Sequence, residues 1–170
     1  DWVTPYWNGT TFFDYPVWGY WMVALSFKLF GPTAFAARLP GALAASLVVI
    51  ASFGLLWRLA PAELPEQQRL GRGLLGASVL ATTPAWIGWA RSSTTDMFLS
   101  SAITLALYGF ALVELAPRAS AERRWEGPLG RVVMALFAGI AVLAKGPVGL
   151  LLPGLVIVVF LGLRGGWCRW

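Results

Sequence analysis

Histidine is absent from this 170-residue chain, and cysteine occurs once, at Cys168. The absence of histidine removes the commonest metal ligand and the commonest general base. A single cysteine cannot form a disulfide within the chain. The sequence also lacks a Gly-rich nucleotide-binding loop, a catalytic triad and a Cys/His metal site. These absences argue against a nucleotide-sugar-dependent or ATP-dependent enzyme in this segment.

Charge is scarce as well, because only 12% of the residues are charged whereas 58% are hydrophobic. A soluble domain carries about twice that charged fraction. The chain holds 10 Trp and 10 Phe, residues that suit the interfaces between membrane and water. The net charge of +5 does not indicate nucleic-acid binding, because the basic residues flank apolar runs and form no continuous stripe. The composition predicts an integral membrane protein.

The two ends of the sequence indicate that it is an internal piece of a longer membrane protein. No signal peptide is visible, the first residue is Asp1, and the last, Trp170, follows an apolar run directly. Residues 1–170 contain no domain linker, so we expect them to be part of one transmembrane domain.

Five uncharged runs approach the length of about 20 residues that a membrane-spanning helix needs. These runs are Leu39–Trp57, Gly73–Ala90, Met97–Val113, Val132–Ala144 and Gly146–Leu163. An earlier run, Tyr15–Gly31, is rich in aromatic residues and is interrupted by Lys28. The sequence therefore predicts a multi-pass helical bundle, with about five membrane passes in residues 39–170.

The arginines are concentrated in alternate connections between these runs. They are Arg58, Arg69 and Arg72 in one connection, Arg118, Arg123, Arg124 and Arg131 in another, and Arg164 and Arg169 after the last run. The positive-inside rule places these connections in the cytoplasm. The remaining connections, which hold Arg38, Arg91 and Lys145, then face the outside.

This topology gives the segment Tyr15–Gly31 an unusual position. Residues 1–14 contain no Lys or Arg and also look external, so the segment cannot cross the membrane once. We expect residues 1–38 to form an external loop, with a turn at Asn8-Gly9, and a juxtamembrane helix along the outer interface. The alternative is that this segment spans the membrane and another run does not.

Lys145 is the only ionisable residue between Arg131 and Arg164. A lysine in such an apolar run is costly unless it reaches water or meets an anion. Gly146-Pro147 can break the helix beside it, which would place the lysine at the outer membrane face. An anionic group could bind it there; the alternative is a lysine that only snorkels to the lipid headgroups.

Further polar residues gather on the same predicted outer face. Asp96 begins a predicted pass, where the helix dipole favours a carboxylate; it could face a substrate or a cation, or simply cap the helix. Asp14, Tyr15 and Arg91 are candidates for the rim of a substrate cavity, with capping and interface anchoring as the alternatives. Acids and a lysine at a lipid–water boundary suit a lipid-phosphate substrate, since a lysine can neutralise a departing phosphate.

At these residues the chain resembles the polytopic glycosyltransferases that use a polyprenyl-phosphate sugar as donor, including the aminoarabinose transferases that modify lipid A and the protein mannosyltransferases. The matching stretches, in the family's order, are Asp1-Trp2-Val3-Thr4-Pro5, Asn8-Gly9, Asp14-Tyr15-Pro16-Val17-Trp18-Gly19-Tyr20-Trp21, Ala24-Leu25-Ser26-Phe27-Lys28-Leu29-Phe30-Gly31, Ala36-Ala37-Arg38-Leu39-Pro40, Thr95-Asp96-Met97 and Ala144-Lys145-Gly146-Pro147-Val148. The resemblance implies an all-helical membrane fold with a catalytic cavity on the outer face and a juxtamembrane helix.

The resemblance also implies roles for individual residues. Lys145 would contact the donor phosphate, and Asp96 would orient donor or acceptor or hold a divalent metal, with no other cofactor implied. The main catalytic base would lie upstream of Asp1. Relatives of the lipid A enzymes usually carry an acidic residue followed by Lys-Pro-Pro where this chain has Asp14-Tyr15-Pro16-Val17. Tyr15 supplies no positive charge at neutral pH.

By resemblance, the chain would belong to a hexosyl- or pentosyltransferase of the plasma (inner) membrane. The enzyme would move a sugar from a polyprenyl-phosphate donor to an extracytoplasmic acceptor, either a lipid A-like glycolipid or a protein, in lipopolysaccharide biosynthesis or protein glycosylation. Its partners would be that donor, the lipid membrane and that acceptor, without nucleic acid, and residues 1–170 alone would be inactive.

Two other classes of protein remain open from the residues. A membrane transporter or flippase for an anionic lipid-linked substrate would use the same charges, and broken helices at mid-membrane with an inverted repeat would favour it. Neither feature is evident in the sequence. A non-catalytic assembly subunit would pack through small residues such as Gly41 and Ala45.

Overall fold

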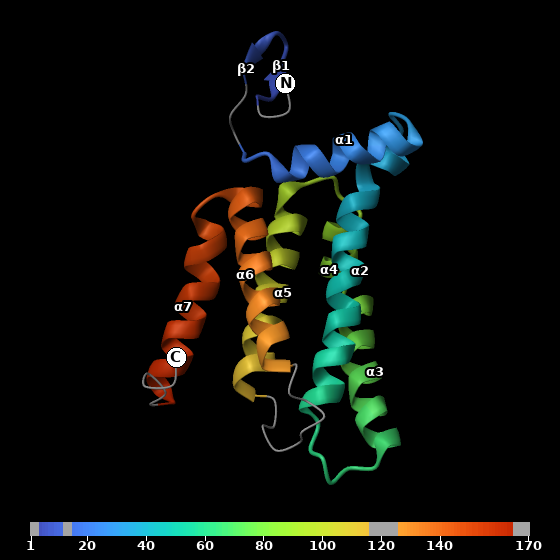
Figure 1. The fold of residues 1–170 in the computed structure, drawn as a ribbon. Coiled ribbons are helices and arrows are strands. Elements are labelled where there is room, and N and C mark those ends of the chain that lie inside the picture. The colour runs from blue at the N-terminus through green and yellow to red at the C-terminus, as the bar shows by residue number, and fades with distance from the viewer. Residues whose placement is uncertain (1–3, 12–14, 116–125, 165–170) are drawn as a thin grey trace.

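The computed structural model describes residues 4–11, 15–115 and 126–164, in which the chain forms two short strands and seven helices. Their bounds are β1 Tyr6–Trp7, β2 Thr10–Thr11, α1 Trp18–Phe30, α2 Ala34–Leu59, α3 Glu66–Thr82, α4 Pro84–Ala90, α5 Thr95–Leu115, α6 Glu126–Lys145 and α7 Val148–Leu163. The helices α2 to α7 run roughly parallel to one axis, and α1 lies across one end of them (Figure 1). The all-α prediction is confirmed.

The two strands form a small antiparallel hairpin beyond α1 (Figure 1). Asn8 and Gly9 connect them, with φ angles of 51° and 79°. Positive φ at both central residues is the signature of a type I′ hairpin turn, for which Asn-Gly is the preferred pair. The predicted turn at Asn8-Gly9 is therefore confirmed.

The first helix, α1, takes the position predicted for a juxtamembrane helix. It ends at Gly31, which has a φ of 75° that glycine adopts without steric strain. The Gly31 amide donates to the Phe27 carbonyl at 2.8 Å. The chain then turns sharply into α2, because the Thr33 hydroxyl accepts from the Ala36 amide at 3.1 Å and starts a new helix. Lys28, in the last turn of α1, is exposed.

Three helices of the described chain are long and apolar enough to cross a membrane: Ala34–Leu59, Thr95–Leu115 and Gly127–Lys145. The 21 residues of α5 extend about 31 Å at 1.5 Å per residue, close to the roughly 30 Å of bilayer hydrocarbon. The helix α7 is also apolar but has only 16 residues. Many of the outward-facing residues are Leu and Val, as lipid contact requires. The chain is part of a multi-pass membrane protein.

The run Gly73–Ala90, predicted as one of the membrane passes, is divided between two helices. The helix α3 stops at Thr82, Thr83 is extended with a φ of −65° and a ψ of 118°, and α4 begins at Pro84. Proline lacks the amide that would continue the helical hydrogen bonds, and it forces the preceding residue out of the helical region. Five passes in residues 39–170 stay a prediction.

Antiparallel packing of α5 against α6 forms the centre of the bundle. At Gly109 the two backbones are so close that a Cβ would lie 2.6 Å from the Met134 nitrogen and 2.7 Å from the Gly130 oxygen. Small residues permit such close approach between membrane helices. The α5–α6 pair fixes which residues meet at the end of the bundle beside α1.

Candidate functional site

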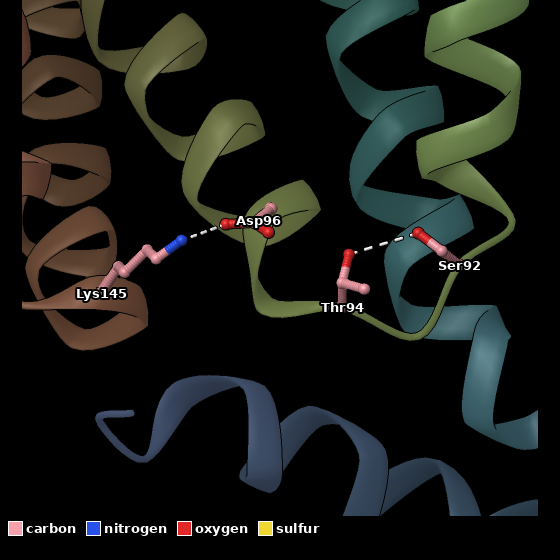
Figure 2. Close-up of polar contacts among 4 residues, drawn as sticks. All are labelled: Ser92, Thr94, Asp96 and Lys145. Atoms are coloured by element: carbon pink, nitrogen blue, oxygen red, sulfur yellow. Dashed lines mark hydrogen bonds and ion pairs between the residues drawn. The ribbon is translucent and has the colours of Figure 1, made fainter. Parts of the chain in front are cut away.

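Lys145 and Asp96 form an ion pair at the end of the bundle covered by α1. Figure 2 shows the lysine reaching from the end of α6 toward the carboxylate at the start of α5. Because the two helices are antiparallel neighbours, the negative end of the α6 dipole and the positive end of the α5 dipole lie together here. Each dipole favours the charge that it meets. The sequence placed both residues on one face, and the structure brings them into contact.

The local sequence sets the position of Lys145. It is the last residue of α6, and Gly146 follows with a φ of 73°, its amide donating to the Val142 carbonyl at 2.7 Å. This glycine-dependent cap ends the helix, and Pro147 then starts the return helix α7. The predicted break at Gly146-Pro147 is therefore present, and it keeps the ammonium group at the end of the bundle.

Asp96 is held by the loop between α4 and α5. In this loop the Ser93 hydroxyl donates to the Ala37 carbonyl of α2 at 3.0 Å, and the Ser92 hydroxyl donates to the Trp89 carbonyl at 2.7 Å. The Ser92 and Thr94 hydroxyls lie 3.2 Å apart (Figure 2). These bonds anchor the start of α5 to neighbouring helices. Asp96 lies in the first turn of α5, where the helix dipole favours a carboxylate.

The ion pair is open to a ligand. The side chains of Lys145 and Asp96 keep 32% and 43% of their surface exposed. A pair so exposed contributes little to stability, because water screens the two charges. Stabilising the bundle therefore does not account for a lysine placed in the longest apolar stretch of the chain.

Tyr15 packs over the ammonium group, which lies 5.6 Å from the centre of the phenol ring. This cation–π contact comes from the segment that leads into α1. The helix is itself docked closely on α5, because a Cβ at Gly19 would lie 3.1 Å from the Thr95 methyl carbon. Tyr15, Asp96 and Lys145 thus form one cluster built from three segments far apart in sequence.

Two predicted rim residues are not part of this described cluster. Arg91 is exposed at the C-terminal end of α4 and makes no ion pair with any described residue. Asp14 lies outside the described residues. The roles predicted for both stay predictions.

The described residues also bear on a metal at this site. Within residues 4–11, 15–115 and 126–164, no three His, Cys, Asp or Glu side chains gather closely enough to hold an ion. Asp96 is the one carboxylate of the cluster, and it faces a lysine, which is a poor environment for a cation. A divalent metal would need ligands from elsewhere in the protein.

Sequence reasoning missed the contact of Tyr15 with Lys145, and it missed the apolar surroundings of the cluster. Trp18 and Phe98, close in sequence to Tyr15 and Asp96, line a cavity beneath α1. No sequence signal marked this cavity, because its lining comes from four helices whose apolar residues resemble any lipid-facing set.

Comparisons with known proteins agree with this geometry. The profile of the family described as Dolichyl-phosphate-mannose-protein mannosyltransferase matches residues 14–170. A relative from Aeromonas salmonicida, named undecaprenyl phosphate-alpha-4-amino-4-deoxy-L-arabinose arabinosyl transferase, is 31% identical over 168 residues. That alignment covers 94% of this chain and 27% of the relative, so the chain spans little more than a quarter of that protein.

Two crystal structures of ArnT from Cupriavidus metallidurans share the fold. The apo structure aligns with a TM-score of 0.87 at 28% identity, covering all of this chain and 29% of that protein. The structure bound to undecaprenyl phosphate aligns with a TM-score of 0.72 at 29% identity, with the same coverage. The chain is thus more similar in shape to the lipid-free structure. The resemblance found in the sequence is confirmed.

Proposed function

Because the chain belongs to the Dolichyl-phosphate-mannose-protein mannosyltransferase family, we propose that it is part of a membrane glycosyltransferase. The enzyme moves a sugar from a polyprenyl-phosphate donor to an extracytoplasmic acceptor, which is a lipid A-like glycolipid or a protein. The observation that carries the proposal is the accessible Lys145–Asp96 pair at the end of the bundle. The relatives named as arabinosyl transferases and the neighbour solved with undecaprenyl phosphate support the lipid-phosphate donor.

The proposed reaction is a direct displacement. An acceptor hydroxyl oxygen bonds to the anomeric carbon of the sugar, the bond from that carbon to the phosphate oxygen breaks, and polyprenyl phosphate leaves with the bonding electrons. The acceptor proton passes to a carboxylate that we place upstream of Asp1. Lys145 would stabilise the charge that grows on the departing phosphate.

Asp96 has a positioning role in this proposal. Before the donor arrives, its carboxylate holds the ammonium group of Lys145 in one place, so the cation is already oriented when a phosphate binds. The phosphate then competes with the carboxylate for the same ammonium protons. Asp96 is left free to accept a hydrogen bond from a sugar or acceptor hydroxyl.

The arrangement of charges supports an outer location for the site. The arginine-rich connections lie at the opposite ends of α2, α5 and α6 from the Lys145–Asp96 pair. By the positive-inside rule those connections are cytoplasmic, so the pair faces away from the cytoplasm. We propose the plasma (inner) membrane, with the active face extracytoplasmic.

Among the described residues, the break between α3 and α4 is a feature that favours a transporter. Transporters bind substrates at broken helices near mid-membrane, where helix ends meet charged groups. The run Gly73–Ala90 that contains this break has no ionisable residue. The Thr82 and Thr83 hydroxyls there donate back to carbonyls of their own helix, Ser78 and Val79, at 2.7 Å. The charged cluster lies elsewhere, so the glycosyltransferase remains our conclusion.

The donor class tests this function directly. Purified full-length protein in lipid vesicles should transfer sugar from a polyprenyl-phosphate-linked donor and not from the corresponding nucleotide sugar. Free undecaprenyl phosphate should inhibit the transfer competitively with the donor. Vesicles without the protein are the control. Transfer from the nucleotide sugar, or inhibitor binding that does not compete with the donor, would overturn the proposal.

A further inference from the structure

An arginine packs on a tryptophan where α2 leads into α3, at the end of the bundle away from α1 (Figure 1). Arg69 of α3 lies over the ring of Trp57, near the end of α2, with its guanidinium carbon 6.0 Å from the ring centre. A terminal nitrogen of Arg69 donates to the Trp57 carbonyl at 3.5 Å, which is long for a hydrogen bond. The cation–π contact therefore holds the guanidinium in place without satisfying its donors.

Most hydrogen-bond donors of this pair have no acceptor among the described residues. A guanidinium carries five N–H donors, and the long bond to Trp57 uses one of them. The Arg69 Nε and Trp57 Nε1 atoms are both buried without a hydrogen-bond partner in the described chain. The positive-inside rule explains why an arginine lies in this connection, but it does not explain unpaired donors packed against an indole. An acceptor from outside the described chain would explain them.

A second arginine lies beside the first. Arg72 follows Arg69 by three residues, so the two are neighbours on the surface of α3, with Cβ atoms about 5–6 Å apart. Arg72 is exposed, and neither arginine forms an ion pair with a described residue, although Glu63 and Glu66 are close in sequence. Arg69 also lies in the first turn of α3, where the helix dipole favours an anion. Adjacent guanidinium groups of this kind match a phosphate, which they can bind with paired hydrogen bonds.

An aliphatic surface continues from Arg72 into the membrane. Leu75 and Val79 follow Arg72 by three and seven residues, which places all three on one flank of α3. Their exposed fractions are 71% and 63%. A different side of α3 is docked on α2, because a Cβ at Gly73 would lie 3.0 Å from the Phe53 carbonyl oxygen. The flank below Arg72 is thus open to lipid over about 10 Å, at 1.5 Å per residue.

From these observations we infer that Arg69 and Arg72 bind the phosphate of an anionic phospholipid, with an acyl chain of that lipid against Leu75 and Val79. By the positive-inside rule this is the cytoplasmic leaflet, where basic residues attract anionic lipids. A zwitterionic lipid such as phosphatidylcholine would bring its own ammonium group beside two arginines, so the site favours a lipid such as phosphatidylglycerol. The lipid site is separate from the Lys145–Asp96 pair and does not depend on the proposed sugar transfer.

Lipid retention by the full-length protein in detergent tests this inference. The probes are phosphatidylglycerol and phosphatidylcholine with identical acyl chains, and native mass spectrometry gives the affinity for each. The unsubstituted protein should prefer phosphatidylglycerol. Arg69→Gln and Arg72→Gln should each weaken its binding about fivefold and leave phosphatidylcholine unchanged. Arg69→Lys should recover only part of the loss, because an ammonium lacks the planar fork. Arg72 is exposed, so its variant keeps the test valid if Arg69→Gln fails to fold.

Arg131→Gln is the matched control, since Arg131 is an exposed arginine near the start of α6, at the same arginine-rich end of the bundle. It should leave the affinity for phosphatidylglycerol unchanged. An equal loss in Arg131→Gln would overturn the site in favour of general attraction to the basic end. Equal affinity of the unsubstituted protein for the two lipids, or unaltered phosphatidylglycerol binding by Arg72→Gln, would also overturn it. Displacement of phosphatidylglycerol by an equal concentration of inorganic phosphate would overturn the lipid assignment and indicate a site for free anions.

Discussion

Replacement of Lys145 is the most informative perturbation of the proposed enzyme. A unit charge about 4 Å from the ammonium group attracts it with an energy that falls as the effective dielectric constant rises. The lysine side chain is 32% exposed, so solvent reduces this energy. Loss of one such contact to a charge that grows in the transition state costs about 100- to 1,000-fold in rate. We expect the rate loss caused by Lys145→Ala to lie toward the lower end of that range.

The assay is sugar transfer from a polyprenyl-phosphate donor, normalised to membrane-inserted full-length protein. Lys28→Ala is the matched control, because Lys28 is the other lysine of the chain and is exposed on α1. It should retain nearly full activity. Lys145→Arg should lose less than Lys145→Ala and still be impaired, because a planar guanidinium does not replace a compact ammonium between Tyr15 and Asp96. Near wild-type transfer by Lys145→Ala would show that the lysine only snorkels, and would refute the reasoning.

Four further predictions address the topology, the ring over the cation, the helix interface and the extent of the enzyme. Single cysteines at Thr10 and Ser92 should react with an impermeant reagent in intact cells, whereas one at Gln67 should react only after permeabilisation; equal reaction at Ser92 and Gln67 would contradict the topology. Tyr15→Phe should keep the cation–π contact, in which the ammonium group lies 5.6 Å from the ring centre. Tyr15→Leu should lose that contact, worth about 0.5–1 kcal/mol, and bind the donor about two- to fivefold more weakly. Equal donor affinities of the two variants would exclude a role for the ring. Gly109→Ala should lower the Tm in detergent by overpacking worth about 1–3 kcal/mol, whereas Gly139→Ala, with no atom within 4 Å of its added Cβ, should not; similar Tm values would contradict the packing. Residues 1–170 expressed alone should insert without transferring sugar, and turnover would show that no upstream carboxylate is needed.

The general architecture could be predicted because the lipid environment constrains it strongly. The distribution of arginines predicted which connections lie at the same end of the bundle, and the position of α1 followed from the lack of basic residues before Tyr15. The break at Thr83 was missed because hydropathy is continuous across Gly73–Ala90. The local effect of Pro84 on the preceding residue was the available signal.

The candidate site was only partly predictable for a different reason. Its charged residues could be assigned to one face, but their contact depends on which helices are neighbours. That choice is made by the close fit of Gly109 against Gly130, and small residues recur on several helices of the chain. A pattern so common cannot identify one partner. The same ambiguity hid the cavity beneath α1.

The crosswise placement of α1 makes the site sensitive to the bilayer itself. The helix α1 is docked on α5 through Gly19 and lies across the end of the bundle at which α5 begins. The length of the bundle therefore sets the depth of α1 relative to the bilayer. In a bilayer thicker than the roughly 31 Å of α5, interfacial anchoring would pull α1 outward while the hydrocarbon mismatch strains the bundle below it. Tyr15 and the cavity roof move with α1, whereas Lys145 and Asp96 stay with the bundle. Hydrophobic thickness would therefore control how closely the aromatic ring and the cation are held together.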